Sequence, residues 1–358
     1  MITGLTGNAG HGSRINLVRK RPSSIDVARL AEVSQATVSY VLSNRTDKVI
    51  SEVTRSKVLA AAEKLSYMPN RLADGILRGK TLTVGVLMPD FGHSFNSKIL
   101  IGLESEFADA GYSILIAHNR NEPELERHQV RMLMEHRVAG IIAVGDEATI
   151  AELPAWVEQA IKLDVDVCVV DDSSLDGIVD TVVSDDIAGA NLAVGHLISQ
   201  GHERIAFLGG SELTTTSRDR RIGYEQALQR HGIDVDPALQ LGHHYRTDVD
   251  PDLSPLIVGP HRATAVFGVS DGLVGQAMMR LESEGIYRRD ILAFVGYGNL
   301  EFSRYLWLTT IEQHPIEMGR RAASRMIARL SGKVSDPVTD RVPPELVVRR
   351  SSFPAKEF

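Results

Sequence analysis

The stretch that decides the fold of the N-terminal region is Ala28-Arg29-Leu30-Ala31-Glu32-Val33-Ser34-Gln35-Ala36-Thr37-Val38-Ser39. Its apolar residues recur at helical spacing on both sides of a short interruption at Glu32 and Val33, which predicts two short helices joined by a tight turn. Ser34 suits the N-cap of the second helix, because its hydroxyl can accept a backbone hydrogen bond there. The stretch therefore predicts a helix-turn-helix.

The residues on either side complete a small helical domain. Ile25, Ala28 and Ala31 form the expected apolar face of the first helix, while Val38, Val41 and Leu42 are expected to point inward from the second. A third helix is expected to begin at the Ser51 cap and to bury Val53, Val58, Leu59, Ala62 and Leu65. The second helix is then left with an outward face of Gln35, Ala36, Thr37, Ser39 and Tyr40. Such a face fits the major groove of DNA.

The charge distribution supports a nucleic-acid partner. Residues 1–81 contain 13 Lys or Arg and 6 Asp or Glu, a net charge of +7, whereas the remainder contains 26 and 40, a net charge of −14. A basic N-terminal module attracts the phosphate backbone, and the acidic remainder is repelled by it. This asymmetry is expected to orient the protein on a duplex.

Length and composition narrow the protein class. A chain of 358 residues is expected to form two or three domains. Its one cysteine, Cys168, lies in an apolar run and offers no disulfide framework. No apolar run is long enough for a membrane span and no signal peptide is evident, so we expect a cytoplasmic protein. Residues 1–20 are expected to be disordered, with a basic arm or a misassigned start as alternatives.

From residue 82 short apolar runs alternate with amphipathic stretches. The first set of expected strands comprises 82–88, 113–117, 140–144 and 165–170, and the second comprises 181–184, 204–208, 265–269 and 291–295. The expected helices are 98–110, 124–136, 150–161, 188–200, 220–231 and 272–284. Strands that alternate with helices predict parallel, doubly wound sheets. Two such sets indicate two lobes, and ligands of open α/β sheets sit beyond the carboxyl ends of the strands.

Several motifs make the chain resemble the lactose/galactose repressor family. The N-terminal ones are Thr37-Val38-Ser39, Thr54-Arg55, Tyr67-x-Pro69-Asn70-x-x-Ala73 and Thr81-x-x-Val84-Gly85-Val86-x-x-Pro89-Asp90. The match continues to about residue 352, through Arg220-x-x-Gly223-Tyr224, Ser270-Asp271 and Leu308-Thr309-Thr310-Ile311 among others. The resemblance implies an all-α helix-turn-helix domain followed by an α/β periplasmic-binding-protein-like core of two doubly wound lobes. It also implies a small-molecule cleft between the lobes.

The resemblance assigns expected boundaries and DNA contacts. The boundaries are a disordered extension 1–22, a helix-turn-helix domain 23–68, a hinge helix 69–81, an effector-binding and dimerisation domain 82–352 and a tail 353–358. Gln35, Ala36 and Tyr40 match the family's base-contacting positions, while Ser34, Thr37, Ser39 and Asn44 complete the expected DNA contacts and chiefly serve phosphates. Tyr40 stands where Arg is frequent, which changes the expected operator because tyrosine cannot make a bidentate contact to guanine. Glu32 stands where Gly is usual, at a turn that favours a left-handed residue.

The hinge segment is expected to fold on operator DNA and to wedge an apolar side chain into the minor groove. Ile76 stands where the family usually has Leu, Leu77 is the alternative wedge, and Asn70 and Ala73 complete the expected contacts. Gly75 lowers helix propensity beside Ile76, so the hinge is expected to be disordered away from DNA. An ordinary interdomain linker is the alternative, and operator affinity that is unchanged by Ile76→Ala would favour it.

The ligand site is expected to suit a sugar or sugar derivative. Phe95, Arg220, Ser270, Asp271, Asn299 and Gln313 are the candidate ligand-binding residues. Two of the family's polar positions have changed, since Ser270 replaces Asn and Gly298 replaces the Asp of many sugar-binding members. Asn299, His244 or Tyr245 are candidate replacements for that carboxylate. A non-sugar ligand therefore remains an alternative.

Catalysis and metal binding are not expected. The histidines are scattered, His243-His244 lacks further ligand spacing, and no nucleophile, Walker or cysteine context appears. No cofactor is expected. The sequence predicts a bacterial cytoplasmic repressor of a carbohydrate operon, associated with the nucleoid when bound to DNA. Its expected partners are a pseudopalindromic operator, a small-molecule effector and a second copy of itself, with no membrane. A dimer is expected because the tail is short, and an activator or global regulator is the alternative function.

Overall fold

The computed structural model describes residues 22–42, 49–68, 81–90, 92–145, 155–210, 214–242, 251–257, 262–285, 292–334 and 336–353. The chain divides into two compact units, residues 1–77 and 78–358. Among the helices of the described residues, none is long and apolar enough to cross a membrane.

The first unit is a three-helix domain, with α1 at Ser24–Ala31, α2 at Gln35–Leu42 and α3 at Glu52–Lys64. Serine hydroxyls cap all three helices. Ser23 forms a capping box with Asp26 at the start of α1. Ser34 accepts from the Thr37 backbone N–H at 3.1 Å, and Ser51 accepts from that of Thr54 at 3.2 Å. The predicted caps Ser34 and Ser51 are thus confirmed, and each satisfies an N–H that the helix cannot pair internally.

The core of this domain differs in part from the predicted one. In α1 the buried residues are Val27, Ala28 and Ala31, while Ile25 is 54 % exposed. In α3 the buried residues are Val58, Ala61 and Ala62, while Val53 and Leu59 are 68 % and 50 % exposed. The predicted burial of Ile25, Val53 and Leu59 was wrong. The real stripe of α3 runs through 58, 61 and 62, the i, i+3, i+4 positions of one face, and the exposed pair lies off it.

The turn between α1 and α2 contains a left-handed residue. Glu32 has φ 56° and ψ 42°, and its backbone N–H donates to the Ala28 carbonyl. A glycine adopts this conformation without strain, whereas a side chain crowds the following carbonyl. The strained geometry predicted for Glu32 is present.

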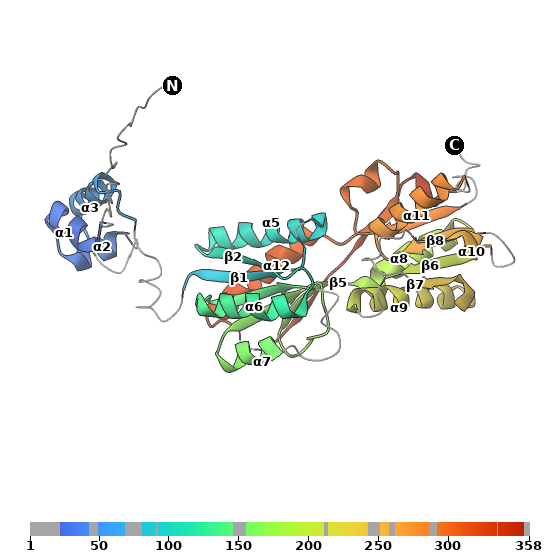
Figure 1. The fold of residues 1–358 in the computed structure, drawn as a ribbon, viewed down its shortest axis with the longest axis horizontal. Helices are drawn as coiled ribbons and strands as arrows, with labels where there is room; N and C mark the ends of the chain where they lie inside the picture. Colours follow the sequence, from blue (N-terminus) through green and yellow to red (C-terminus); the bar gives the residue numbers. More distant parts are fainter. Residues whose placement is uncertain are drawn as a thin grey trace, which may run out of the picture. The chain divides into compact units, whose positions relative to one another are not determined.

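The second unit contains two six-stranded sheets, each in its own lobe (Figure 1). The first lobe has strand order β11-β5-β4-β3-β1-β2 and parallel pairings throughout. Its elements are β1 Thr83–Met88, α5 Ser94–Asp109, β2 Ser113–His118, α6 Pro123–Glu135, β3 Gly140–Val144, α7 Ala155–Lys162, β4 Asp166–Val170, β5 Asp180–Ser184, α12 Pro315–Leu330 and β11 Thr339–Val342. Its central strands are continuous apolar runs because helices cover both faces of a parallel sheet.

The second lobe has strand order β12-β10-β9-β8-β6-β7, and only β12 among these strands pairs antiparallel. Its longer elements are α8 Asp186–Ser199, β6 Ile205–Gly209, α9 Thr215–Arg230, β8 Ala265–Gly268, α11 Asp271–Ser283, β9 Ala293–Tyr297 and β10 Thr309–Glu312. The shorter ones are η1 Pro237–Leu239, β7 Gln240–Gly242, α10 Ser254–Ile257, η2 Glu301–Arg304, β12 Glu345–Val347 and η3 Arg350–Ser352. The two doubly wound lobes predicted from the sequence are confirmed.

The chain passes between the lobes after β5, after β10 and after β11. As a consequence, α12 packs against α5 in the first lobe although it comes from the C-terminal part of the chain (Figure 1). The sequence assigned 181–184 to the second set of strands, and this was wrong: β5 pairs with β4 and β11 in the first sheet. Apolar periodicity identifies a strand but does not reveal which sheet it joins.

Two glycines allow α5 and α12 to cross closely. A Cβ atom built on Gly102 would lie 2.1 Å from the Ile316 carbonyl oxygen, and one built on Gly319 would lie 2.2 Å from that of Ile99. No side chain fits at either distance, because the neighbouring atom is backbone and cannot move aside. The returning helix is therefore held against the first lobe by backbone contact.

Candidate functional site

The exposed face of α2 is the candidate DNA-reading surface of the first unit. Gln35, Ala36 and Ser39 are exposed, and Thr37 and Tyr40 are half-buried. The Gln35 amide Nε2 donates to the Ser24 hydroxyl at 2.9 Å, which links α2 to the start of α1. The exposed face of α2 therefore presents hydrogen-bonding side chains with the small Ala36 among them. Such a face can approach the edges of the bases.

Other predicted contact residues lie outside the described residues. These are Asn44, Asn70, Ala73, Ile76 and Leu77 among the DNA contacts, and His244 and Tyr245 among the candidate ligand groups. The predicted extension 1–22, apart from Pro22, the hinge up to residue 80 and the tail after residue 353 also lie outside them.

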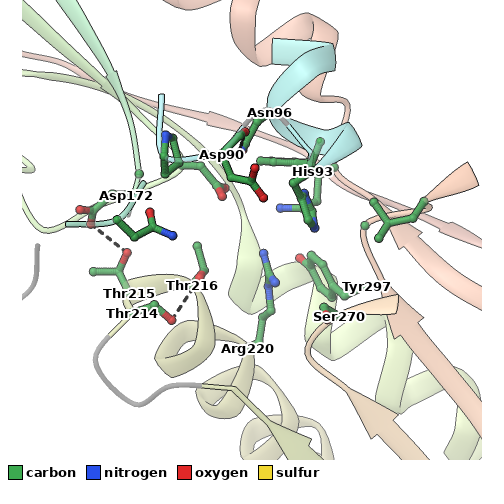
Figure 2. Close-up of a pocket in the computed structure, with 18 of the residues that line it drawn as sticks. Asp90, His93, Asn96, Asp172, Thr214, Thr215, Thr216, Arg220, Ser270 and Tyr297 are labelled. Atoms are coloured by element: carbon green, nitrogen blue, oxygen red, sulfur yellow. Dashed lines mark hydrogen bonds between the residues drawn. The ribbon is translucent and has the colours of Figure 1, made fainter. Parts of the chain in front are cut away.

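The second unit contains a pocket between its two lobes, with a volume of about 560 Å³. This volume lies in the usual range for small-molecule sites. Figure 2 shows Asp90, His93 and Asn96 of the first lobe on one side and Arg220, Ser270 and Tyr297 of the second lobe on the other. Most of the lining residues follow the carboxyl ends of strands or begin the next helix, as expected for open α/β sheets.

Four of the six predicted ligand residues line this pocket: Phe95, Arg220, Ser270 and Gln313. Phe95 is buried in the first turn of α5, with the His93 ring edge-on at 6.4 Å between ring centroids. Ser270 caps α11 by accepting from the Leu273 backbone N–H. The buried Gln313 Nε2 has no hydrogen-bond partner among the described residues, so the pocket retains an unused donor.

Arg220 is held rigidly at the pocket wall. Its Nε and Nη2 donate to the two carboxylate oxygens of Asp186 at 3.2 and 3.3 Å, and its Nη1 donates to the Val269 carbonyl at 2.7 Å. The guanidinium lies 3.9 Å from the centroid of the Tyr297 ring. Arg220 and Asp186 are both buried, and such a bidentate pair fixes the arginine in one orientation.

Asp271 and Asn299 are not among the pocket-lining residues. Asp271 is fully buried and accepts from the hydroxyls of Ser303 and Thr310 and from the Leu300 backbone N–H. The Asn299 side chain donates to Glu312 and accepts from Arg349, both at 2.7 Å. Both predicted residues therefore hold second-lobe segments together. Their hydrogen-bond partners lie far away in the sequence, which is why position after a strand did not reveal this role.

The pocket also includes a carboxylate that sequence reasoning treated as ordinary loop capping. Asp171 follows β4 at φ 66°, and its Oδ1 is buried with no hydrogen-bond partner among the described residues. The pKa of Asp171 is raised to about 8, mainly because the group is buried and next because Asp186 carries a negative charge nearby. Burial likewise raises the pKa of Asp186, although Arg220 opposes this shift. Arg220 is paired with Asp186 through both oxygens, so Asp171 has no full counter-charge and is mostly protonated near neutral pH.

Several other residues that line the pocket were not predicted from the sequence. They include Asn96, His118, Arg120, Asn121, Asp172, Thr214, Thr215 and Thr216. Arg120 and Asn121 have φ values of 54° and 57°, left-handed conformations that cluster at functional loops. Each set follows a predicted strand or precedes a helix, so the rule for strand ends, applied to every strand, would have found them.

The described residues contain no group of three or more His, Cys, Asp or Glu side chains placed to hold a metal ion. The pocket groups are hydroxyls, amides, carboxylates, two histidines, the exposed Arg120 and the engaged Arg220, with the buried Phe95 and Tyr297 rings beside them. This donor set can bind a polar organic molecule through hydrogen bonds.

Comparison with known proteins identifies the two units. Residues 25–70 match the family "Bacterial regulatory proteins, lacI family", and residues 194–352 match "Periplasmic binding protein-like domain". The HTH-type transcriptional repressor PurR of Vibrio vulnificus (strain CMCP6) is 30 % identical over 327 residues, covering 90 % of this chain and 96 % of that protein. PurR of Vibrio campbellii (strain ATCC BAA-1116) is 30 % identical over 329 residues, covering 91 % of this chain and 97 % of that protein.

Known structures agree over nearly the whole chain. The lac repressor dimer bound to operator and the anti-inducer ONPF has a TM-score of 0.78 and 26 % identity, covering 93 % of this chain and all of that one. The complex of the transcriptional regulator CelR with cellobiose has a TM-score of 0.68 and 26 % identity, covering 92 % of this chain and all of that one. These relatives are transcription regulators, not enzymes. The chain therefore belongs to the lacI family of bacterial regulatory proteins, as a DNA-binding transcriptional repressor with an effector-binding domain.

Proposed function

We propose that this repressor controls genes of carbohydrate uptake or breakdown and that a sugar or sugar derivative in the interlobe pocket sets its operator affinity. The observation that carries the proposal is the pocket itself, in which neutral hydroxyl and amide groups from both lobes converge around the fixed Arg220. Hydroxyl-rich ligands need many such donors and acceptors. The relative CelR is known as a cellobiose complex, and a lacI-family regulator from Enterococcus faecium as a complex with bound ribose.

The proposed DNA interface is the exposed face of α2. Gln35, Ala36 and Tyr40 read base edges, while Ser34, Thr37 and Ser39 position the helix on phosphates. The lac repressor binds its operator as a dimer, and we propose a homodimer here as well. Two-fold symmetry then requires a pseudopalindromic operator with half-sites about 10 base pairs apart. Asn44 and the hinge residues Asn70, Ala73, Ile76 and Leu77 stay predictions, as does a cytoplasmic location at the nucleoid.

The proposed coupling uses the connections between the lobes. A ligand that contacts both walls favours one lobe arrangement, and the three interlobe passages transmit that preference to the segment that leads to the first unit. Coupling free energies of this kind are typically about 1–3 kcal/mol. Operator affinity measured with and without ligand tells whether the ligand releases the repressor from the operator or strengthens its binding.

A nucleobase or nucleoside is the second candidate ligand. Phe95 and His93 offer aromatic rings at the pocket, and Gln313 offers an amide with an unused donor, a combination that suits a planar heterocycle. Response to a non-sugar ligand or to a protein partner is the alternative to control by a sugar.

The test is operator affinity of the full chain, measured at constant salt with and without sugars, nucleobases and nucleosides. At least a fivefold change with a sugar supports the proposal, and a change only with nucleobases replaces the ligand class. Gln35→Ala should weaken specific binding more than non-specific binding, because it removes a base contact and no phosphate contact. Glu63→Ala, at an exposed position of α3, is the matched control and should leave the ratio unchanged.

A further inference from the structure

The buried part of the pocket contains more carboxylate than cationic charge. Asp172 and Asp186 are each 4 % exposed, the Asp171 Oδ1 atom is buried, and Arg220, at 7 % exposed, is the one buried cation beside them among the described residues. Arg120 also lines the pocket, but its side chain is exposed, where water screens its charge. A buried carboxylate without a cation is costly unless it is neutralised or paired.

Two of the three carboxylates are already satisfied. Asp186 binds Arg220 through both oxygens. Asp172 accepts from the Ser174 backbone N–H and hydroxyl at 2.8 and 2.9 Å and from the Thr215 hydroxyl at 3.0 Å. Asp171 is different, because its buried Oδ1 atom accepts nothing among the described residues. With the pKa of Asp171 raised to about 8, a proton neutralises this carboxyl in the ligand-free protein, and a cationic group of the ligand can take the place of that proton.

The two walls of the pocket differ in charge. The carboxylates Asp90, Asp171 and Asp172 all follow first-lobe strands β1 and β4, with His93, His118 and Arg120 on the same wall. The second-lobe wall carries neutral donors and acceptors, which are Thr214, Thr215, Thr216, Ser270 and Gln313, around an arginine already paired to Asp186. Figure 2 shows this division, with Asp90 across the pocket from Ser270 and Arg220.

We infer that the effector carries a protonated amino group that binds the Asp171 carboxylate, while its hydroxyl groups bind the neutral second-lobe wall. The chemical class is an amino sugar or a related amino polyol. This inference rests on the proposed function, because it assumes that the effector occupies the interlobe pocket. It also predicts exclusion of phosphorylated and carboxylated sugars, since their anions would face Asp171 and Asp172 with the buried arginine already engaged.

The test uses matched probes on the full chain, by titration calorimetry at pH 7. Glucosamine and galactosamine are compared with glucose, galactose, N-acetylglucosamine and glucose 6-phosphate. N-acetylglucosamine keeps the nitrogen but loses the charge. We expect glucosamine and galactosamine to bind at least tenfold more tightly than glucose, galactose and N-acetylglucosamine. Glucose 6-phosphate should bind most weakly.

Two variants locate the effect. Asp171→Asn should abolish the preference for amines, because the amide keeps the shape but cannot give up a proton and pair with an ammonium group. Asp164→Asn is the matched control, since Asp164 is an exposed first-lobe aspartate with a similar left-handed φ of 56°. This control should retain the full preference.

The outcomes separate the inference from the proposed function. Equal or tighter binding of the neutral sugars, or an amine preference that survives Asp171→Asn, overturns the inference while leaving a sugar effector in place. Absence of binding by every sugar, amino sugar and sugar phosphate, together with binding of a nucleobase, overturns the carbohydrate proposal as well.

Discussion

Replacing Glu32 by glycine should stabilise the helix-turn-helix unit. Glu32 is held at φ 56° and ψ 42°, and its backbone N–H closes the end of α1. A side chain in this conformation costs about 1–2 kcal/mol, whereas glycine loses roughly 0.5–1 kcal/mol more chain entropy on folding. The difference spans about 0–1.5 kcal/mol, and the middle of that range, about 0.5–1 kcal/mol, is the net gain expected for Glu32→Gly.

A charge effect must be separated from this backbone effect. Glu32 lines a shallow depression together with Lys57 and Lys64, so its removal also changes local electrostatics. Glu32→Ala removes the carboxylate but keeps the Cβ atom that causes the strain. It should therefore show no gain, which makes it the matched control.

The assay is hydrogen exchange of the full chain, followed by mass spectrometry of peptides from α1 and α2. A gain of about 0.5–1 kcal/mol slows exchange roughly two- to fivefold when exchange reports the opening equilibrium. Peptides from β3 lie in the other compact unit and should not change. Equal slowing by Glu32→Ala, or no slowing by Glu32→Gly, would refute the backbone argument.

Three further predictions concern the second unit. Gly102→Ala should destabilise it by at least roughly 1–3 kcal/mol in urea unfolding, because the new Cβ would lie 2.1 Å from the Ile316 carbonyl oxygen; an unchanged midpoint would show that the helices can separate at no cost. Arg220→Ala should cost about 3–5 kcal/mol by leaving Asp186 buried and unpaired, and Arg220→Ala together with Asp186→Ala should recover part of that loss in the same assay. The folded chain binds the Asp171 proton more tightly than the unfolded chain, because its pKa is raised from 3.8 to about 8. Wild-type stability should therefore fall relative to Asp171→Asn as the pH rises from 5 to 8, by at most about 1.4 kcal/mol per pH unit, and parallel stability curves would contradict this.

The fold was largely predictable because its signals are local. Buried parallel strands such as β3 and β4 are continuous apolar runs, and serine caps mark the helix starts at Ser34 and Ser51. The assignment of β5 to a lobe was not predictable in this way, because it depends on pairing with β11, more than a hundred residues later. The crossing of α12 over α5 is likewise a long-range event.

The candidate pocket was predictable in part for the same reason. Phe95 and Gln313 follow strands and line the pocket, as the strand-end rule expects. Asp271 also follows a strand, yet Ser303 and Thr310 surround it with hydroxyls and remove it from the pocket. Asp171 was discounted because a carboxylate after a strand is ordinary in sequence; its unpartnered buried oxygen is visible only in three dimensions.

The most direct test of the proposed DNA interface is selection of genomic DNA fragments by the purified full chain at moderate salt, followed by footprinting of the enriched fragments. A dimeric repressor that reads DNA through α2 should protect a pseudopalindrome with half-sites about 10 base pairs apart, and Gln35→Ala should abolish that protection. Diffuse enrichment without a shared sequence, unchanged by Gln35→Ala at every ligand condition, would contradict it.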